Sequence, residues 1–369
     1  MMKYIKLGKI CNIKTGKLDA NASSENGIYP FFTCSREPLK ISSYSYDCEC
    51  VLVAGNGELN VKYYNGKFDA YQRTYIIEVL DKIKYSTKFL YLLINSKMEE
   101  LRNASIGGVI KYIKLGNLTD IDVPIIAIDK QNDIVNNMLS MNKVIRLKKS
   151  QIKKFDVLIK SQFVEMFENK DFPYVQFKEY MERCVDIGSN GANAVVMEHY
   201  NMTDTKDYAM VIRFTNLNSG DFEKDVKYIN KEDYEFYSKS KVYGDEIIFC
   251  KIGSAGVNYI MPKLNMPVTL GLNQIMVTPK NINIRYLYEY INSYEGKKYI
   301  NNNINGAVTK TITKHALWDF PIKIPPIELQ NEFASIVEQI DKQKFVNANL
   351  LQLLVKNLKR CYNNIMSFR

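Results

Sequence analysis

Two stretches of the chain carry apolar residues at alternating steps of four and three, the pattern of a helix with one apolar stripe. The first stripe runs from Ile134 to Met166, and the second runs from Phe333 to Ile365. Each stripe covers about five heptads and has a polar break in its middle. Neither stretch contains glycine or proline. The pattern therefore predicts two long helices, over residues 129–168 and 328–369.

A long helix with a single apolar stripe must bury that stripe against a partner. The two stripes share their length and register, so we expect the helices to pair as an antiparallel coiled coil. Such pairing would relate the two halves of the chain by a pseudo-twofold axis. The alternative is that each helix packs on its own domain.

The chain also repeats itself at an offset of 199 residues, which places Gly306 opposite Gly107. Further identical pairs are Val109 and Val308, Lys111 and Lys310, and Gln131 and Gln330. With small gaps the similarity extends upstream, where YQRTYIIEV around Gln72 resembles LNQIMVTP around Gln274, and the segment near Tyr4 resembles the one near Tyr174. A repeat of this length predicts two similar globular domains, 1–128 and 169–327, each followed by one long helix.

Both domains mix predicted strands and helices. In the first, ECVLVAGNGELNVKYYNG and TYIIEVL are typical of strands around an Asn-Gly turn, and KFLYLLINSKMEELRNA is typical of a helix. In the second, YAMVIRFTNLNSGDF and DEIIFCKIGSAGVNYI are typical of strands and turns. Because no regular βαβ alternation appears, the expected class is α+β.

The formal net charge of +10 favours polyanionic partners. No segment approaches the roughly 18 to 20 unbroken apolar residues of a membrane span. Charged residues precede any apolar run at the start of the chain, which argues against a secretory signal. We therefore expect a cytoplasmic protein that does not bind membranes.

Seven cysteines and two histidines are scattered along the chain. Cys48 and Cys50 are separated by one residue, whereas zinc-binding pairs are separated by two to four. These features predict reduced thiols and neither a metal site nor a cofactor.

Four kinds of catalytic signature are missing. The only Pro-Pro pair, Pro325–Pro326, is followed by Ile327, whereas an amino-methyltransferase loop has Asn or Asp before the prolines and an aromatic residue after them. No GxxxxGK[ST] motif occurs, no carboxylate cluster suits a nuclease metal, and His315 has no evident Cys or Ser partner. The glycine pairs at Gly55 and Gly253 are typical of hairpin turns. The sequence therefore predicts a non-catalytic protein.

The junctions between domain and helix resemble one family. FPIKIPPIELQNEFASIVEQID, starting at Phe320, has a proline-rich turn, an acidic residue and a glutamine just before a heptad helix. IDVPIIAIDKQNDIV, starting at Ile121, is a weaker copy that has lost the Pro-Pro pair. VIRFTNLNSG and VYGDEIIFCKIGSAG also resemble segments of the same family. Over essentially its whole length, the chain resembles the specificity subunits of type I restriction–modification systems.

That resemblance implies a function. Two target-recognition domains would each read one half of a split sequence in double-stranded DNA, and the helices would fix the gap between the halves. Two methyltransferase subunits would dock on the chain, and restriction subunits are a further expected partner. Independently of the resemblance, two unlike domains on a pseudo-twofold frame suit two unlike half-sites about one helical turn apart.

Candidate DNA contacts follow from residue chemistry. For phosphates, we expect Lys111 beside Gly107 and Gly108, and Lys310 beside Gly306, because glycine allows close approach of the backbone. For bases, arginine suits guanine, while asparagine and glutamine suit adenine. The base-reading candidates are Arg36, Asn56, Gln72, Arg73, Asn193, Arg213, Asn216, Asn273 and Gln274.

Two other functions remain open at the level of sequence. A protein-binding scaffold would show no affinity above nonspecific binding for any duplex. A fused modification–specificity enzyme would transfer methyl groups by itself, although the chain is short for this and lacks the methylation motif.

Overall fold

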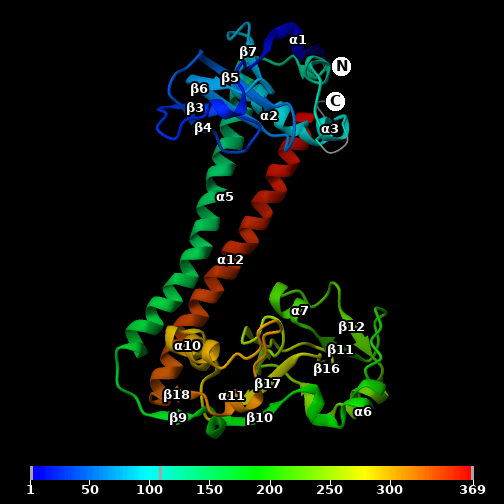
Figure 1. Cartoon of the computed structure of the whole chain (residues 1–369), viewed down its shortest axis with the longest axis vertical. Coiled ribbons are helices and arrows are strands. Elements are labelled where there is room, and N and C mark those ends of the chain that lie inside the picture. The colour runs from blue at the N-terminus through cyan, green and yellow to red at the C-terminus, as the bar shows by residue number, and fades with distance from the viewer. Residues whose placement is uncertain (1–2, 108–109, 367–369) are drawn as a thin grey trace. The chain divides into compact units, whose positions relative to one another are not determined.

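The structure, a computed structural model, describes residues 3–107 and 110–366, with side chains described up to residue 363. Gly108, Val109 and the side chain of Ile365 therefore lie outside the described part. The chain divides into two compact units (Figure 1). Unit 1 comprises Met1–Gln151 and Val346–Arg369, and unit 2 comprises Ile152–Phe345.

Unit 1 is built on a six-stranded sheet with the strand order β2-β7-β5-β6-β3-β4. Its strands are β2 (Cys11–Thr15), β3 (Tyr29–Phe32), β4 (Leu39–Ile41), β5 (Tyr46–Ala54), β6 (Val61–Ala70) and β7 (Thr74–Val79). All neighbouring strands are antiparallel except β3 and β6. The helices of this domain are α1 (Leu7–Ile10), η1 (Ala20–Ala22), α2 (Thr87–Ser96), α3 (Met98–Asn103) and α4 (Leu115–Thr119).

Strand β5 shows why this sheet is covered on both faces. Successive side chains of a strand point to opposite faces. Val51 and Val53 enter the core that includes α2, whereas Cys50 and Leu52 enter a second core with Phe68. The unbroken apolar run in the sequence is thus explained by burial on both sides. In Figure 1, α2 lies against this sheet.

Unit 2 contains two four-stranded sheets, with the orders β10-β17-β14-β15 and β12-β11-β16-β13. The strands of the first are β10 (Met181–Val185), β14 (Ile247–Cys250), β15 (Asn258–Ile260) and β17 (Gln274–Pro279). Those of the second are β11 (Ala209–Ile212), β12 (Lys227–Ile229), β13 (Lys241–Val242) and β16 (Val268–Leu270). Ile247 and Phe249 face one core and Ile248 faces another, as in β5 of unit 1.

Shorter elements complete both units. The remaining strands form two antiparallel pairs, β1 (Tyr4–Lys6) with β8 (Asp122–Pro124) and β9 (Tyr174–Gln176) with β18 (Pro321–Lys323). The remaining short helices are η2 (Val164–Glu168), η3 (Phe177–Tyr180), η4 (Ile187–Asn190), α6 (Asn193–Glu198), α7 (Phe214–Ser219), α8 (Lys231–Phe236), η5 (Ser238–Ser240), α9 (Ile284–Asn292), α10 (Tyr294–Asn302) and α11 (Lys314–Trp318). Tyr4 pairs with Pro124 as Tyr174 pairs with Lys323, so the predicted match of the two domain starts is confirmed.

The two long helices are α5 (Ile128–Phe163) and α12 (Ile327–Met366). In unit 1, Leu358 and Tyr362 of α12 pack on the core that includes Met138 of α5. Closer to the middle of both helices, the Lys148 ammonium donates to the Asn347 side chain at 2.7 Å. Their order along α12 is the reverse of that along α5, so the pairing within unit 1 is antiparallel.

The helix segments in unit 2 are also antiparallel. Phe163 at the end of α5 meets Phe333 near the start of α12, with 5.7 Å between ring centroids. Nearer the middle of the helices, Lys344 forms an ion pair with Asp156. The predicted pairing of the two apolar stripes is thus confirmed within each unit.

A buried glutamine at the start of each long helix explains the repeated junction sequence. Gln131 accepts a hydrogen bond from the backbone N–H of Ser86 at 2.9 Å, and Gln330 accepts one from the N–H of Asn283 at 2.9 Å. Ser86 and Asn283 are the N-caps of α2 and α9. Both glutamines also donate to junction carbonyls, those of Ile126 and Pro325. Each glutamine therefore ties the long helix to its domain.

One detail of the sequence interpretation is wrong. FTNLNS forms the short helix α7 rather than a turn, and Gly220 ends it with φ 66°. The similar segments around Gln72 and Gln274 occupy equivalent places, because Thr74 pairs with Ala54 as Gln274 pairs with Cys250.

None of the helices in the described part of the chain is long and apolar enough to cross a membrane. The seven cysteines form no disulfide, and the described residues contain no cluster of three His, Cys, Asp or Glu side chains that could hold a metal ion.

Candidate nucleic-acid interface

Three segments meet at one edge of unit 1. They are residues 55–57 after β5, residues 71–74 at the start of β7, and residues 110–113. The Gly55 N–H donates to the Arg73 carbonyl at 2.8 Å, and the Gly57 N–H donates to the Lys111 carbonyl at 3.0 Å. The Ile113 N–H donates a hydrogen bond to the Gly55 carbonyl at 2.9 Å. We refer to these three segments as the unit 1 edge.

Unit 2 has the same arrangement, built from residues 251–253, 272–274 and 309–312, which we call the unit 2 edge. The Lys251 N–H donates to the Asn273 carbonyl at 2.7 Å, and the Gly253 N–H donates to the Lys310 carbonyl at 3.0 Å. The Ile312 N–H donates to the Lys251 carbonyl at 3.0 Å. The sequence repeat thus corresponds to a repeated set of backbone hydrogen bonds.

The glycine of each repeated loop closes a tight turn. Gly107 has φ 115° and Gly306 has φ 98°. A Cβ on Gly107 would lie 2.4 Å from the Ile110 carbonyl oxygen, and one on Gly306 would lie 2.2 Å from that of Thr309. Both positions therefore require glycine for the loop itself, whatever approaches it from outside.

The structure brings all five candidates of the first domain to this region. Three of them, Gln72, Arg73 and Lys111, are exposed within the unit 1 edge. Half-buried Asn56 forms an isolated antiparallel β-bridge with Tyr112. Exposed Arg36 lies beside the edge. The candidates of the first domain are thus neighbours in space, although they span much of its sequence.

An ion pair fixes the place of Arg36. Its guanidinium forms an ion pair with Glu58, with Nε to Oε1 at 2.9 Å, and Glu58 follows the 55–57 segment directly.

Gln72 and Arg73 line a small pocket together with Thr15, Gly55 and Tyr75. The first domain therefore presents an amide and a guanidinium, the two groups that recognise base edges best, around one concave site.

The candidates of the second domain are more dispersed. Asn273 and Lys310 are exposed on the unit 2 edge. Arg213 is half-buried after β11 and donates to the Asp225 carbonyl, while its Nε has no partner among the described residues. Asn193 is exposed at the first residue of α6.

Asn216 and Gln274 are buried, with 2% and 1% of their surface exposed. The Asn216 amide donates to the Asp221 carbonyl, and the Gln274 carbonyl accepts from the Gly271 N–H at 3.0 Å. Both side chains support turns inside the domain. Both side chains are covered in this conformation, so reading a base would require them to become exposed, and their choice as base readers stays a prediction.

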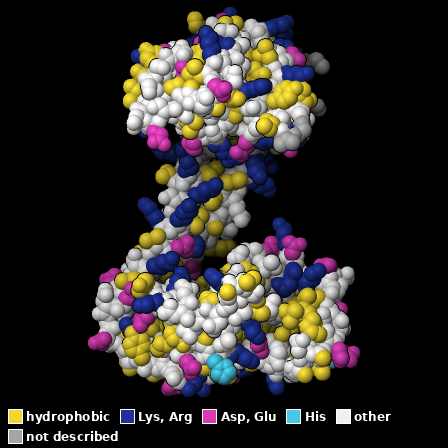
Figure 2. All heavy atoms as spheres, in the orientation of Figure 1, with side chains coloured by type: hydrophobic (Ala, Val, Ile, Leu, Met, Phe, Trp, Pro, Cys, Tyr) yellow, Lys and Arg dark blue, Asp and Glu magenta, His cyan; other side chains and the backbone are white. Residues whose placement is uncertain are grey.

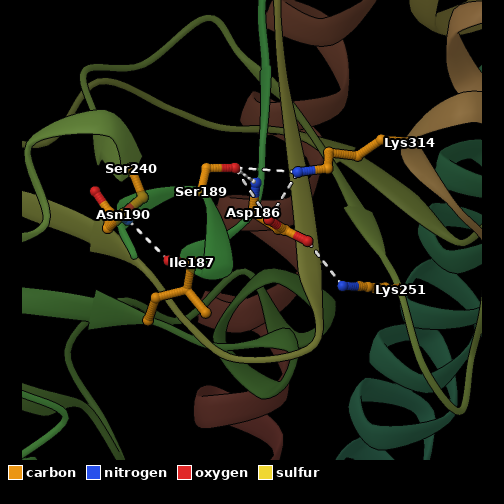
Figure 3. Close-up of polar contacts among 7 residues, drawn as sticks. All are labelled: Asp186, Ile187, Ser189, Asn190, Ser240, Lys251 and Lys314. Carbon is orange, nitrogen blue, oxygen red and sulfur yellow. Dashed lines mark hydrogen bonds and ion pairs between the residues drawn. The ribbon is translucent and has the colours of Figure 1, made fainter. Parts of the chain in front are cut away.

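One cluster at the unit 2 edge escaped sequence reasoning (Figure 3). The Lys251 ammonium lies 2.7 Å from one oxygen of Asp186, and the Lys314 ammonium lies 3.0 Å from the other. Ser189 Oγ donates to the same carboxylate at 3.0 Å. Lys251 and Lys314 are 65 and 128 residues from Asp186 in the sequence and meet it only in the folded domain, so no local motif marks them.

The carboxyl group of Asp186 stays ionised because of these lysines. Burial alone would raise its pKa, since the charged form loses hydration. Hydrogen bonds and charges from Lys251 and Lys314 outweigh that effect and lower the pKa from 3.8 to about 2.

Charge is not concentrated on one visible face of either unit. Figure 2 shows Lys and Arg side chains with Asp and Glu side chains interspersed among them. On this face, any attraction for polyanions would depend on local groupings of Lys and Arg rather than on a uniformly basic surface.

Comparison with known proteins defines the class. The family model for the type I restriction modification DNA specificity domain matches residues 1–155 and 194–355 of this chain. These two matches cover most of the sequence. The chain therefore belongs to the type I restriction modification DNA specificity family.

A curated protein of Escherichia coli, the type I restriction enzyme EcoDI specificity subunit, is 26% identical over 402 aligned positions, which cover 98% of this chain and 85% of that protein. The fold resembles that of the type I restriction-modification S subunit from M. genitalium, with a TM-score of 0.62, 14% identity and coverage of 99% and 96%. A chain from a structural study of complex assembly and conformational transition in a type I R-M system gives a TM-score of 0.59, 14% identity and coverage of 99% and 97%. At such identities the two structures support the fold alone.

Proposed function

We propose that this chain is the non-catalytic specificity subunit of a type I restriction–modification complex and reads a bipartite sequence in double-stranded DNA. The observation that carries the proposal is the repeated edge, in which one backbone scaffold presents different side chains in each unit. Family membership and the likeness to the E. coli specificity subunit support it.

Each edge would face one half of the target. At the unit 1 edge, Arg73 and Gln72 would read bases together with Asn56 and Arg36, while Lys111 binds phosphate. At the unit 2 edge, Asn273 would read a base and Lys310 would bind phosphate. Arg213 and Asn193 are further proposed contacts of the second domain. Because the two side-chain sets differ, the half-sites should differ in sequence.

The proposed division of labour follows the repeat. Residues 1–128 and 169–327 would be the recognition domains, and helices 129–168 and 328–369 would space them about a pseudo-twofold axis. Two methyltransferase subunits would dock on the chain and supply the methylation chemistry, with restriction subunits as additional partners. Such a complex would act in the cytoplasm, where the cell keeps its DNA.

The decisive experiment is selection from a duplex library of random sequence. The full chain, assembled with a methyltransferase subunit of a type I system, is incubated with the library, and the bound duplexes are sequenced. The expected product is a sequence of two short conserved blocks separated by a fixed unconserved gap. A complex of the E. coli specificity subunit with its own methyltransferase serves as the positive control.

Enrichment of a single continuous block, or of none, would contradict the proposal. Methyl transfer by the isolated chain would contradict its non-catalytic part.

A further inference from the structure

The unit 2 edge carries a charged group that unit 1 lacks. Asp186 directly follows β10, and its carboxylate forms ion pairs with Lys251, which follows β14, and with Lys314 at the start of α11. The matching positions of unit 1 are the uncharged residues Thr15, Gly55 and Leu115. The cluster therefore distinguishes the two recognition domains.

We propose that Asp186 is a positioning residue that holds Lys251 and Lys314 ready to bind backbone phosphates of the half-site read by unit 2. This inference rests on the proposed function and specifies one contact within it.

The exposures of the three side chains support this role. The Asp186 side chain is 9% exposed, whereas those of Lys251 and Lys314 are 36% and 29% exposed. The carboxylate is thus covered while both lysines still reach solvent. Each ammonium group can therefore meet a ligand from solvent while it stays paired with the carboxylate.

Both ammonium groups keep the capacity to donate further hydrogen bonds. An ammonium has three N–H donors. Lys251 uses one on Asp186, and Lys314 uses two, on Asp186 and on Ser189 at 3.1 Å. The two positive charges also exceed the single negative charge, so the cluster remains cationic. A lysine that is already held loses less conformational freedom when it binds a phosphate.

The cluster belongs to the same surface as the other contacts of this domain. The backbone of Lys251 is bonded to Asn273 and to Ile312, within the unit 2 edge. Lys310, two residues before Ile312, is exposed beside it. Phosphate binding by the cluster would therefore fix the duplex next to the proposed base reader Asn273.

The salt dependence of DNA binding tests the inference. Binding of the complex of the full chain with its methyltransferase is measured by fluorescence anisotropy over a range of KCl concentrations, with the selected duplex as probe. Each lost phosphate contact lowers the slope of log K against log salt by about 0.9. We expect K251Q and K314Q each to reduce the slope by about this amount, and K251R to restore it.

Lys263 offers a matched control. It forms an ion pair with Asp245 at the other end of β14, so K263Q should leave the slope unchanged. Unchanged slopes in K251Q and K314Q, or an equal reduction in K263Q, would overturn the inference. Thermal unfolding establishes that each variant is folded, and K251M and K314M replace any glutamine variant that is not.

The positioning role itself is tested by D186N, which removes a negative charge and releases both lysines. Affinity for a scrambled duplex should not fall, because the edge becomes more positive. Affinity for the selected duplex should fall roughly tenfold, the scale of one lost contact to a charged group. A parallel loss for both duplexes, or no loss for either, would reject the positioning role. If the wild-type complex selects no sequence, the proposed function itself fails. If it selects a sequence but the variants bind as the wild type does, only the present inference fails.

Discussion

At the scale of single residues, the Asp186 carboxylate couples the stability of unit 2 to pH. Its pKa is lowered to about 2 in the folded chain, below the value near 3.8 expected when it is solvated. A depressed pKa of this kind stabilises the fold above the unfolded pKa, and the contribution is lost as pH falls through the folded pKa. Its size is about 2 kcal/mol.

We therefore expect D186N to lower the free energy of unfolding by about 2 kcal/mol at neutral pH. The gap from wild type should shrink as pH falls from about 4 towards 2. Urea denaturation at a series of pH values measures this gap. D47N, at an exposed position on β5, is the control and should remain close to wild type throughout. A gap that is constant across the series would show that the ion pairs do not stabilise the fold.

Arg73 offers a second prediction at the same scale. Because its exposed guanidinium suits the two acceptors of guanine, R73A should cost about 1–3 kcal/mol of affinity for the selected duplex. It should also relax selection at one base position only. Binding to duplexes that differ by single base pairs measures both effects. K40A, at an exposed lysine of β4 in the same domain, should leave the selection unchanged, and loss at every position in R73A would instead indicate a phosphate contact.

At the scale of elements, the junction glutamines connect each long helix to the domain before it. Q330A would leave the Asn283 N–H and the Pro325 carbonyl without their partner at a buried site. We expect a loss of about 2–3 kcal/mol, since stranded buried polar groups each cost roughly 1–3 kcal/mol. Chemical denaturation of the full chain gives the value. E332A, two residues further along the same helix and exposed, should be neutral, and an equally neutral Q330A would mean that water replaces the side chain.

Elements also show what sequence patterns predict well. The heptad spacing of apolar residues predicts both long helices. Because each apolar stripe must be buried, the spacing also predicts that the helices pair, and they do so in the expected antiparallel direction within each unit. The paired glycines give the repeated loops, because a positive φ at Gly107 and Gly306 excludes other residues. The α7 helix was predicted as a turn, since Asn, Ser and Gly favour turns and its helical state depends on packing of Leu217.

The identity of the surface side chains is harder to predict. Asn216 and Gln274 have the right chemistry to read bases, but backbone groups of nearby turns hold them inside the domain. The Asp186 cluster is invisible to local patterns because Lys251, after β14, and Lys314, in α11, reach Asp186 only in the folded domain. Residue type gives a chemical capacity, whereas burial and register decide whether DNA can reach it.

At the scale of the whole molecule, the proposed function makes the long helices a ruler. Lys148 and Asn347 occupy matching positions of the repeat near the middle of their helices and are hydrogen-bonded to each other. Inserting one heptad into each helix near these residues keeps the apolar stripes in phase. Seven residues add about 10 Å of helix, which corresponds to roughly three base pairs.

We expect the selected gap to lengthen by about three base pairs while both half-sites stay the same. Selection from the random duplex library reads both quantities. Inserting seven residues into only one helix is the control and should abolish specific binding, because the stripes no longer match. An unchanged gap in the doubly extended chain would show that the helices do not set the spacing.

In each unit the three segments of the edge are joined through backbone atoms alone. A hydrogen bond between main-chain groups is indifferent to which side chain its residue carries. Exposed positions such as Arg73 and Lys310 can therefore change without loosening the scaffold beneath them. Within a lineage, single substitutions at such positions can change which DNA sequence the protein binds while the backbone of the edge stays the same.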